Sequence, residues 1–113
     1  MKKIIHNKLV RDKIPKIIQT DNKQCKVSIL QKTDYIEQLK KKLVEEAQEV
    51  QEASTKQDII LELADLLEVM NALKASFQIT ATKIEEARKT KAYQNGAFTK
   101  HLFLEYVEET DHE

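Results

Sequence analysis

Residues 57–77, which read QDIILELADLLEVMNALKASF, decide the fold. Wound as a helix, this stretch has apolar residues on nearly every side: Ile59, Ile60, Leu61, Leu63, Ala64, Leu66, Leu67, Val69, Met70, Ala72 and Leu73. A helix that is apolar all round is a buried helix. Two neighbouring helices cannot cover that much apolar surface, so we expect a dimer that completes a helical bundle.

The residues before this stretch predict a second long helix, from Asp34 to about Ser54. Asp34 and Glu37 have the spacing of a capping box, which would mark the start of the helix. Apolar residues then recur at steps of three and four, as on the buried face of an amphipathic helix: Ile36, Leu39, Leu43, Ala47, Val50 and Ala53.

The rest of the chain predicts shorter elements and completes an all-α fold, in a single helical domain of residues 1–113. A third helix is expected to start after Thr80 and to end near Gly96, since glycine commonly stops a helix. A short helix is expected around Pro15, because proline is tolerated in a first helical turn. Short extended or irregular segments are expected near the termini, at residues 25–30 and 98–107.

Composition excludes several classes of partner. The 19 basic and 19 acidic residues cancel, so no net field attracts a nucleic-acid polymer. No apolar run approaches the roughly 18 residues of a membrane span, and none of signal-peptide length follows the basic N-terminus. The single cysteine, Cys25, cannot form an intrachain disulfide. These features predict a cytoplasmic protein without a membrane or nucleic-acid partner.

Carboxylates on the two long helices are the most informative polar residues. Glu45, Glu46 and Glu49 fall within about 100° of arc on the first helix, where they repel one another unless a cation is bound. Glu62 and Asp65 interrupt the apolar run and share a face, and a buried ionised carboxylate is costly unless it is paired or binds metal. Facing helices that both present acids predict an all-oxygen site for Mg²⁺ or Mn²⁺.

Other interpretations of these acids stay open from the residues alone. Glutamate-rich helix faces are usually exposed to solvent, and taken by themselves Glu45, Glu46 and Glu49 fit such a face. Glu62 and Asp65 fit a solvent-exposed face less well, because most of their neighbours on the helix are apolar. A di-iron carboxylate centre would require Glu-x-x-His pairs. The histidines lie outside both helices, at His6, His101 and His112.

Four segments form an ordered set of motifs. They are Glu-Glu-Ala-Gln-Glu at 45–49, Glu-Leu-Ala-Asp at 62–65, Asn-Lys-Leu-Val-Arg-Asp-Lys-Ile-Pro at 7–15, and Lys91 with Gly96 and Phe98. Together they resemble the all-α nucleoside triphosphate pyrophosphohydrolase superfamily, in its MazG-like and phosphoribosyl-ATP pyrophosphohydrolase-like single-domain group. One departure concerns the last motif, where the resemblance leads us to expect Arg-Gly and the chain has Asn95-Gly96.

The resemblance implies a dimeric or tetrameric helical core that binds one or more Mg²⁺ ions and hydrolyses a nucleotide to a monophosphate and pyrophosphate. It also implies that the substrate could be a non-canonical nucleotide that the enzyme clears. We expect the metal ligands, directly or through water, to be Glu45, Glu46, Glu49, Glu62 and Asp65. Glu46 and Glu49 are the candidates for the base that activates water, and the sequence does not choose between them.

Basic residues near the N-terminus are candidates for binding phosphate. Residues 1–16 contain six lysines or arginines and one acid. We expect Lys8, Arg11 and Lys13 to bind the outer phosphates, with arginine suited to a bidentate contact. The alternative that they only solvate a terminal segment is equally compatible with composition alone. The resemblance adds Lys91 as a fourth phosphate ligand.

Three functions remain candidates at this point. The first is a pyrophosphohydrolase that acts on a nucleoside triphosphate, and the second is a phosphoribosyl-ATP pyrophosphohydrolase of histidine biosynthesis. The third is a non-catalytic, nucleotide-binding helical partner protein, which the charges within the apolar helix disfavour because apolar residues would pack better there. The sequence leaves open the base and sugar, the number of metal ions and the oligomeric state.

Overall fold

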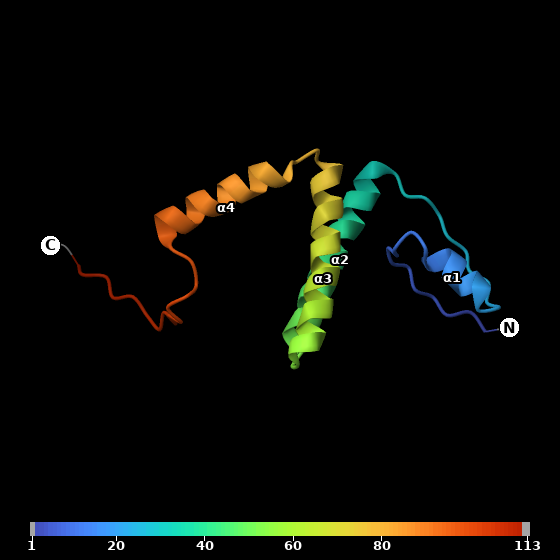
Figure 1. Cartoon of the computed structure of the whole chain (residues 1–113), viewed down its shortest axis with the longest axis horizontal. Coiled ribbons are helices and arrows are strands. Elements are labelled where there is room, and N and C mark those ends of the chain that lie inside the picture. Colours follow the sequence, from blue (N-terminus) through green and yellow to red (C-terminus); the bar gives the residue numbers. More distant parts are fainter. Residues whose placement is uncertain (1, 112–113) are drawn as a thin grey trace. The chain divides into compact units, whose positions relative to one another are not determined.

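A computed structural model describes residues 2–111, and within that range it contains helices and no strand (Figure 1). The helices are α1 Ile14–Thr20, α2 Lys32–Glu52, α3 Lys56–Ser76 and α4 Ala81–Asn95. The predicted all-α class is therefore confirmed. The chain divides into two units, Met1–Thr80 and Ala81–Glu113, of which the first contains α1, α2 and α3 and the second contains α4. Within the described residues, no helix is both long and apolar enough to cross a membrane.

The centre of the first unit is the hairpin of α2 and α3, which pack against each other along their length (Figure 1). A short connection joins them, and Thr55 at its end caps α3 by accepting a hydrogen bond from the Asp58 backbone N–H at 3.1 Å. Asp58 in the first turn and Lys74 in the last turn of α3 have the signs that the helix dipole favours. The first long helix, predicted to end at about Ser54, ends at Glu52, and the next one starts at this cap.

Burial along both helices follows one stripe on each. Leu39 on α2 is 3% exposed and Val69 on α3 is 9% exposed, and these are the buried apolar side chains of the described residues. Half-buried residues continue each stripe at helical spacing: Ile36, Leu43, Glu46 and Val50 on α2, and Ile59, Glu62, Asp65, Leu66 and Leu73 on α3. Three carboxylates therefore lie within the facing stripes, among apolar side chains.

The expectation that α3 is buried on all sides is not met within one chain. Its outer face remains open, with Ile60 50%, Leu63 47%, Leu67 53% and Met70 40% exposed. The physical reason is that α2 is the one helix packed along α3 in this unit, and one neighbour covers one face. These four residues recur at steps of three and four and form a second apolar stripe, which we call the outer stripe of α3.

The ends of two helices differ in how well the sequence predicted them. The capping box of Asp34 and Glu37 is wrong, because α2 begins earlier, at Lys32, with Gln31 as its N-cap and no side-chain cap hydrogen bond. The end of α4 before Gly96 is confirmed, since Gly96 has φ +85° and its N–H bonds the Ala92 carbonyl at 2.8 Å. Residues 25–30 and 98–107 have neither helix nor strand.

Candidate metal centre

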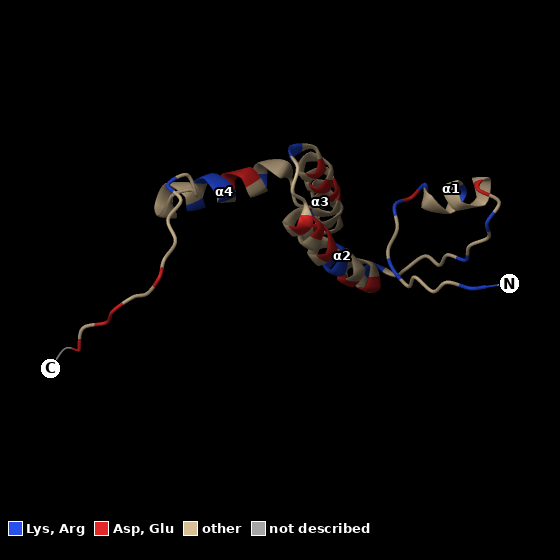
Figure 2. Cartoon of the chain, turned by 90° about the horizontal axis from the view of Figure 1, so that it is seen from below, with Lys and Arg blue, Asp and Glu red and all other residues tan. Residues whose placement is uncertain are grey.

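Three carboxylates from the two facing helices converge in the first unit. Glu46 of α2 and Glu62 and Asp65 of α3 each offer an oxygen, and these oxygens all lie within 4.8 Å of one another. All three residues are half-buried. Figure 2 shows the acidic residues of α2 and α3 within the hairpin. We call these three residues the carboxylate cluster.

The helical register explains why the cluster forms. Glu46 lies seven residues after Leu39, and Glu62 lies seven residues before Val69, so each acid shares a helix face with a buried apolar residue two turns away. Glu62 and Asp65, three residues apart, are neighbours on one face of α3. The packing that buries Leu39 and Val69 therefore also turns the three carboxylates toward the helix interface.

Negative charge accumulates around Glu62. Partial loss of solvent raises its pKa above the ordinary 4.5, and repulsion from Glu49, Asp65 and Glu46 raises it further. A bound cation would reverse this effect, because a nearby positive charge favours the ionised form. An oxygen-only donor set of this kind suits a hard divalent ion such as Mg²⁺ or Mn²⁺, so the residues present fit such a metal.

The other two predicted metal ligands lie outside the cluster. Glu45 is exposed, and its Oε2 lies 3.6 Å from Lys42 Nζ. Glu49 is exposed as well; it stands three residues after Glu46 on α2, the spacing of neighbouring side chains on a helix. Its charge contributes to the raised pKa of Glu62. The structure thus brings together three of the five predicted ligands. All five, Glu45 and Glu49 included, stay predictions as metal ligands, directly or through water.

Lys42 is a site residue that the sequence reasoning missed. Its Nζ lies 3.9 Å from Glu46 Oε1 as well as close to Glu45, and its side chain is 22% exposed. The signal was present, since Lys42 stands four residues before Glu46, a spacing at which helical side chains meet. The acidic run from Glu45 to Glu52 itself contains no lysine, and Lys42 lies just before it.

One of the predicted phosphate-binding residues contacts the cluster. Arg11 Nη2 donates a hydrogen bond to Asp65 Oδ1 at 2.7 Å, across 54 residues of sequence. Lys8 and Lys13 are exposed and flank Arg11 in the sequence, in the stretch that leads into α1. Lys91 is exposed on α4, in the second unit.

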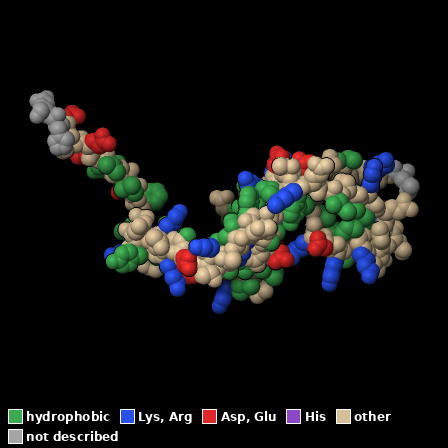
Figure 3. All heavy atoms as spheres, turned by 90° about the horizontal axis from the view of Figure 1, so that it is seen from above, with side chains coloured by type: hydrophobic (Ala, Val, Ile, Leu, Met, Phe, Trp, Pro, Cys, Tyr) green, Lys and Arg blue, Asp and Glu red, His purple; other side chains and the backbone are tan. Residues whose placement is uncertain are grey.

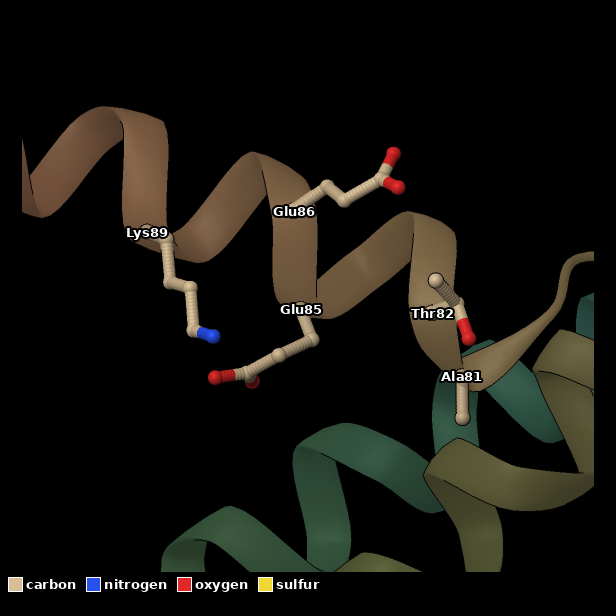
Figure 4. Close-up of a pocket in the computed structure, with 5 residues that line it drawn as sticks. All are labelled: Ala81, Thr82, Glu85, Glu86 and Lys89. Carbon is tan, nitrogen blue, oxygen red and sulfur yellow. The ribbon is translucent and has the colours of Figure 1, made fainter.

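A shallow hollow on α4 offers no comparable chemistry. Its lining residues are Ala81, Thr82, Glu85, Glu86 and Lys89 (Figure 4). Glu85 is already paired with Arg88 at 2.6 Å, and the hydrogen bond from Arg88 lowers the pKa of Glu85. This hollow contains none of the clustered carboxylates, and we assign no site to it.

Comparison with known proteins agrees with this geometry. A model of the phosphoribosyl-ATP pyrophosphohydrolase family matches residues 12–92, which is most of the chain and includes the whole of α2 and α3. The chain belongs to this family. The resemblance to the MazG-like all-α superfamily is thereby confirmed, and membership indicates a pyrophosphohydrolase, an enzyme that acts on an acid anhydride. No curated protein and no solved structure matches the chain.

The family match also bears on the choice between substrates. It supports phosphoribosyl-ATP, the second of the three candidate functions, better than an ordinary nucleoside triphosphate, which was the first. All five predicted metal ligands of this family member fall inside the match, as do Lys13 and Lys91. Lys8 and Arg11 lie just before its first residue.

Replacing Glu62 by Gln tests the crowding of charge. A carboxyl group whose folded-state pKa is raised destabilises the fold when it is ionised, and this cost disappears as pH falls below the ordinary value of 4.5. In EDTA at about pH 7, Glu62→Gln should therefore have a higher melting temperature than wild type, and the difference should shrink toward zero near pH 4. Thermal unfolding monitored by circular dichroism measures both.

The matched control is Glu105→Gln, which removes the same charge from an exposed position in the C-terminal segment. It should leave the melting temperature in EDTA nearly unchanged. A lower melting temperature for Glu62→Gln at neutral pH would contradict the loss of solvent and the repulsion assigned to Glu62.

Proposed function

We propose that this protein is a divalent-metal-dependent phosphoribosyl-ATP pyrophosphohydrolase, which releases pyrophosphate by cleaving the bond between the α and β phosphates. The observation that carries the proposal is the carboxylate cluster, which lies on facing helices inside the region of the family match. Its oxygen donors fit Mg²⁺, which proteins usually hold with a few carboxylates together with substrate phosphates.

Each acid then has a role that its position supports. Glu46, Glu62 and Asp65 would hold the metal, and Glu45 and Glu49 would be further ligands, directly or through water. When bound, the metal neutralises phosphate charge and increases the acidity of water. Glu49 is the better placed base, because it is exposed and adjacent to the cluster while Glu46 is engaged within it. It takes a proton as a water oxygen bonds to the α phosphorus and the bond to the β phosphate breaks.

Cations of the N-terminal segment bind the departing pyrophosphate in this scheme. Arg11 already reaches the cluster, so a phosphate beside the metal would lie within range of its guanidinium group. Lys8 and Lys13 lie on either side of Arg11 in the sequence, and Lys91 is carried over from the resembling motif. Arginine can bind phosphate through two parallel hydrogen bonds, whereas lysine acts as a point charge.

A nucleoside triphosphate, including a non-canonical one, is the second substrate candidate. The observation that favours this second candidate is Asn95-Gly96, at a position where the resemblance leads us to expect arginine before glycine. Without an arginine at that position, the site lacks one phosphate-binding side chain. Substrate selectivity then depends on the remaining residues. The substrate assay therefore compares both classes.

We further propose that residues 1–113 act as one domain, which works as a homodimer. The family match runs from the first unit into the second, which supports a single functional domain. The outer stripe of α3 supports a second copy as its cover, since four exposed aliphatic side chains at helical spacing suit a helix-bundle interface. Figure 3 shows the hydrophobic side chains that one face of the chain leaves open to solvent.

Asp65→Asn tests the catalytic proposal. With Mg²⁺, pyrophosphate release from phosphoribosyl-ATP should fall by about a hundredfold or more, because a charged ligand is replaced by a neutral one. EDTA should abolish release by the wild type. The control Asp21→Asn changes the same residue type in an exposed pair with Lys23 and should keep full activity. The assay follows pyrophosphate release, with a parallel panel of canonical and modified nucleoside triphosphates.

The panel separates the candidate functions. Release from triphosphates but not from phosphoribosyl-ATP would make a nucleoside triphosphate the substrate instead. No metal-dependent release from any substrate, with wild type folded, would reject the enzymatic proposal in favour of a non-catalytic protein.

Leu67→Lys tests the interface. A charge in the middle of the outer stripe should shift the protein toward monomer and raise the dimer dissociation constant by about tenfold or more, since burying an unpaired charge is costly. Light scattering after size-exclusion chromatography measures the mass. Leu102→Lys, at an 87% exposed leucine outside α3, is the matched control and should remain dimeric. A wild type that is monomeric at all concentrations would contradict the dimer.

A further inference from the structure

Arg11 makes a contact of unusual range. Its ion pair with Asp65 joins residues 54 apart in the sequence. By comparison, Lys23–Asp21, Lys42–Glu46 and Arg88–Glu85 join residues within one helical turn of each other. The Arg11 side chain is 57% exposed and that of half-buried Asp65 is 43% exposed, so solvent screens the pair. Solvent-screened ion pairs contribute little to stability, so this contact can be broken at little cost to the fold.

The partner of Arg11 is itself a member of the carboxylate cluster. Asp65 belongs to the cluster and also forms the ion pair with Arg11. On the opposite helix, Lys42 lies beside Glu46. Two protein cations thus offset two of the three carboxylates. Neither cation can be a metal ligand, because protonated lysine and arginine have no free lone pair to donate. A divalent ion among the carboxylates would repel the guanidinium and compete with it for Asp65.

Arg11 has a second partner available once Asp65 binds a metal. A guanidinium group matches phosphate in the same bidentate geometry with which it matches carboxylate. Arg11 precedes α1 in a stretch without helix or strand, and its side chain is exposed, so it can reorient without disturbing a packed core.

We propose that Arg11 exchanges partners on binding: it holds Asp65 in the metal-free protein and transfers to a substrate phosphate when a divalent metal takes Asp65. This inference rests on the proposed function and deepens it, because it makes metal and phosphate binding cooperative. The metal frees Arg11 for phosphate, and by linkage phosphate draws Arg11 away and favours the metal to the same degree. In the metal-free protein Arg11 also limits repulsion among the clustered acids.

Arg11→Gln should change the two affinities in opposite directions. Mg²⁺ and Mn²⁺ should bind the full-length variant about threefold to fivefold more tightly than wild type, since a competing exposed ion pair is gone. Inorganic pyrophosphate in the presence of Mn²⁺ should bind about tenfold more weakly, since a charged hydrogen-bond donor is lost. Isothermal titration calorimetry measures both without reference to activity.

Arg88→Gln is a closely matched control. The Arg88–Glu85 pair has a separation of 2.6 Å and side chains 59% and 50% exposed, close to the values for Arg11 and Asp65. Glu85 lies outside the carboxylate cluster, so this variant should bind metal as the wild type does. Arg11→Lys, which keeps the charge, should bind metal with nearly wild-type affinity.

A measurement on the unaltered protein guards against a variant that does not fold. The chain has two arginines, Arg11 and Arg88, so their side-chain Nε–H signals in a nitrogen-15 NMR spectrum are readily distinguished. Mg²⁺ should shift the Arg11 signal and leave that of Arg88 in place.

Two outcomes would overturn the exchange, and they differ in what else they reject. Wild type that binds Mg²⁺ with the same affinity as Arg11→Gln, and an unmoved Arg11 signal, would make the ion pair merely structural while leaving the metal centre intact. Wild type that binds neither Mg²⁺ nor Mn²⁺ would reject the exchange and the metal-dependent function together.

Discussion

The packing of α2 against α3 is the constraint on which the rest of the structure depends. Leu39 and Val69 are buried in this contact, and the same two helix faces present Glu46, Glu62 and Asp65. Apolar burial favours closing the hairpin, but closing also removes water from Glu62 and brings the carboxylates together, and both effects raise the pKa of Glu62. One contact thus both forms the hairpin and concentrates the charge that a metal would neutralise.

This conflict links stability to function. A metal that binds the folded hairpin and not the unfolded chain adds its binding free energy to stability. Without metal, Lys42 and Arg11 offset part of the negative charge, one from within α2 and one from the N-terminal segment. Functional sites often contain residues that lower the stability of the fold. Here the destabilising residues are the clustered carboxylates in the contact between α2 and α3.

The sequence predicted what depends on neighbouring residues. The α3 helix, the end of α4 at Gly96 and the shared face of Glu62 and Asp65 follow from helical periodicity and from glycine. The start of α2 was wrong because Asp34 and Glu37 match a capping box in sequence, while the helix extends back to Gln31 without a side-chain cap. The Arg11–Asp65 pair could not be predicted, since nothing local relates residues 54 apart. Helical periodicity likewise shows that the outer stripe of α3 is apolar, but it does not show which surface packs against that stripe.

The claim that the carboxylate cluster is a metal centre is tested most directly by a crystal structure of the protein grown with Mn²⁺, with anomalous scattering used to locate the ion. The account predicts an anomalous peak at roughly 2.0–2.3 Å from oxygens of Glu46, Glu62 and Asp65, the usual range for hard divalent ions. A peak elsewhere, or none at a Mn²⁺ concentration that supports activity, would contradict it.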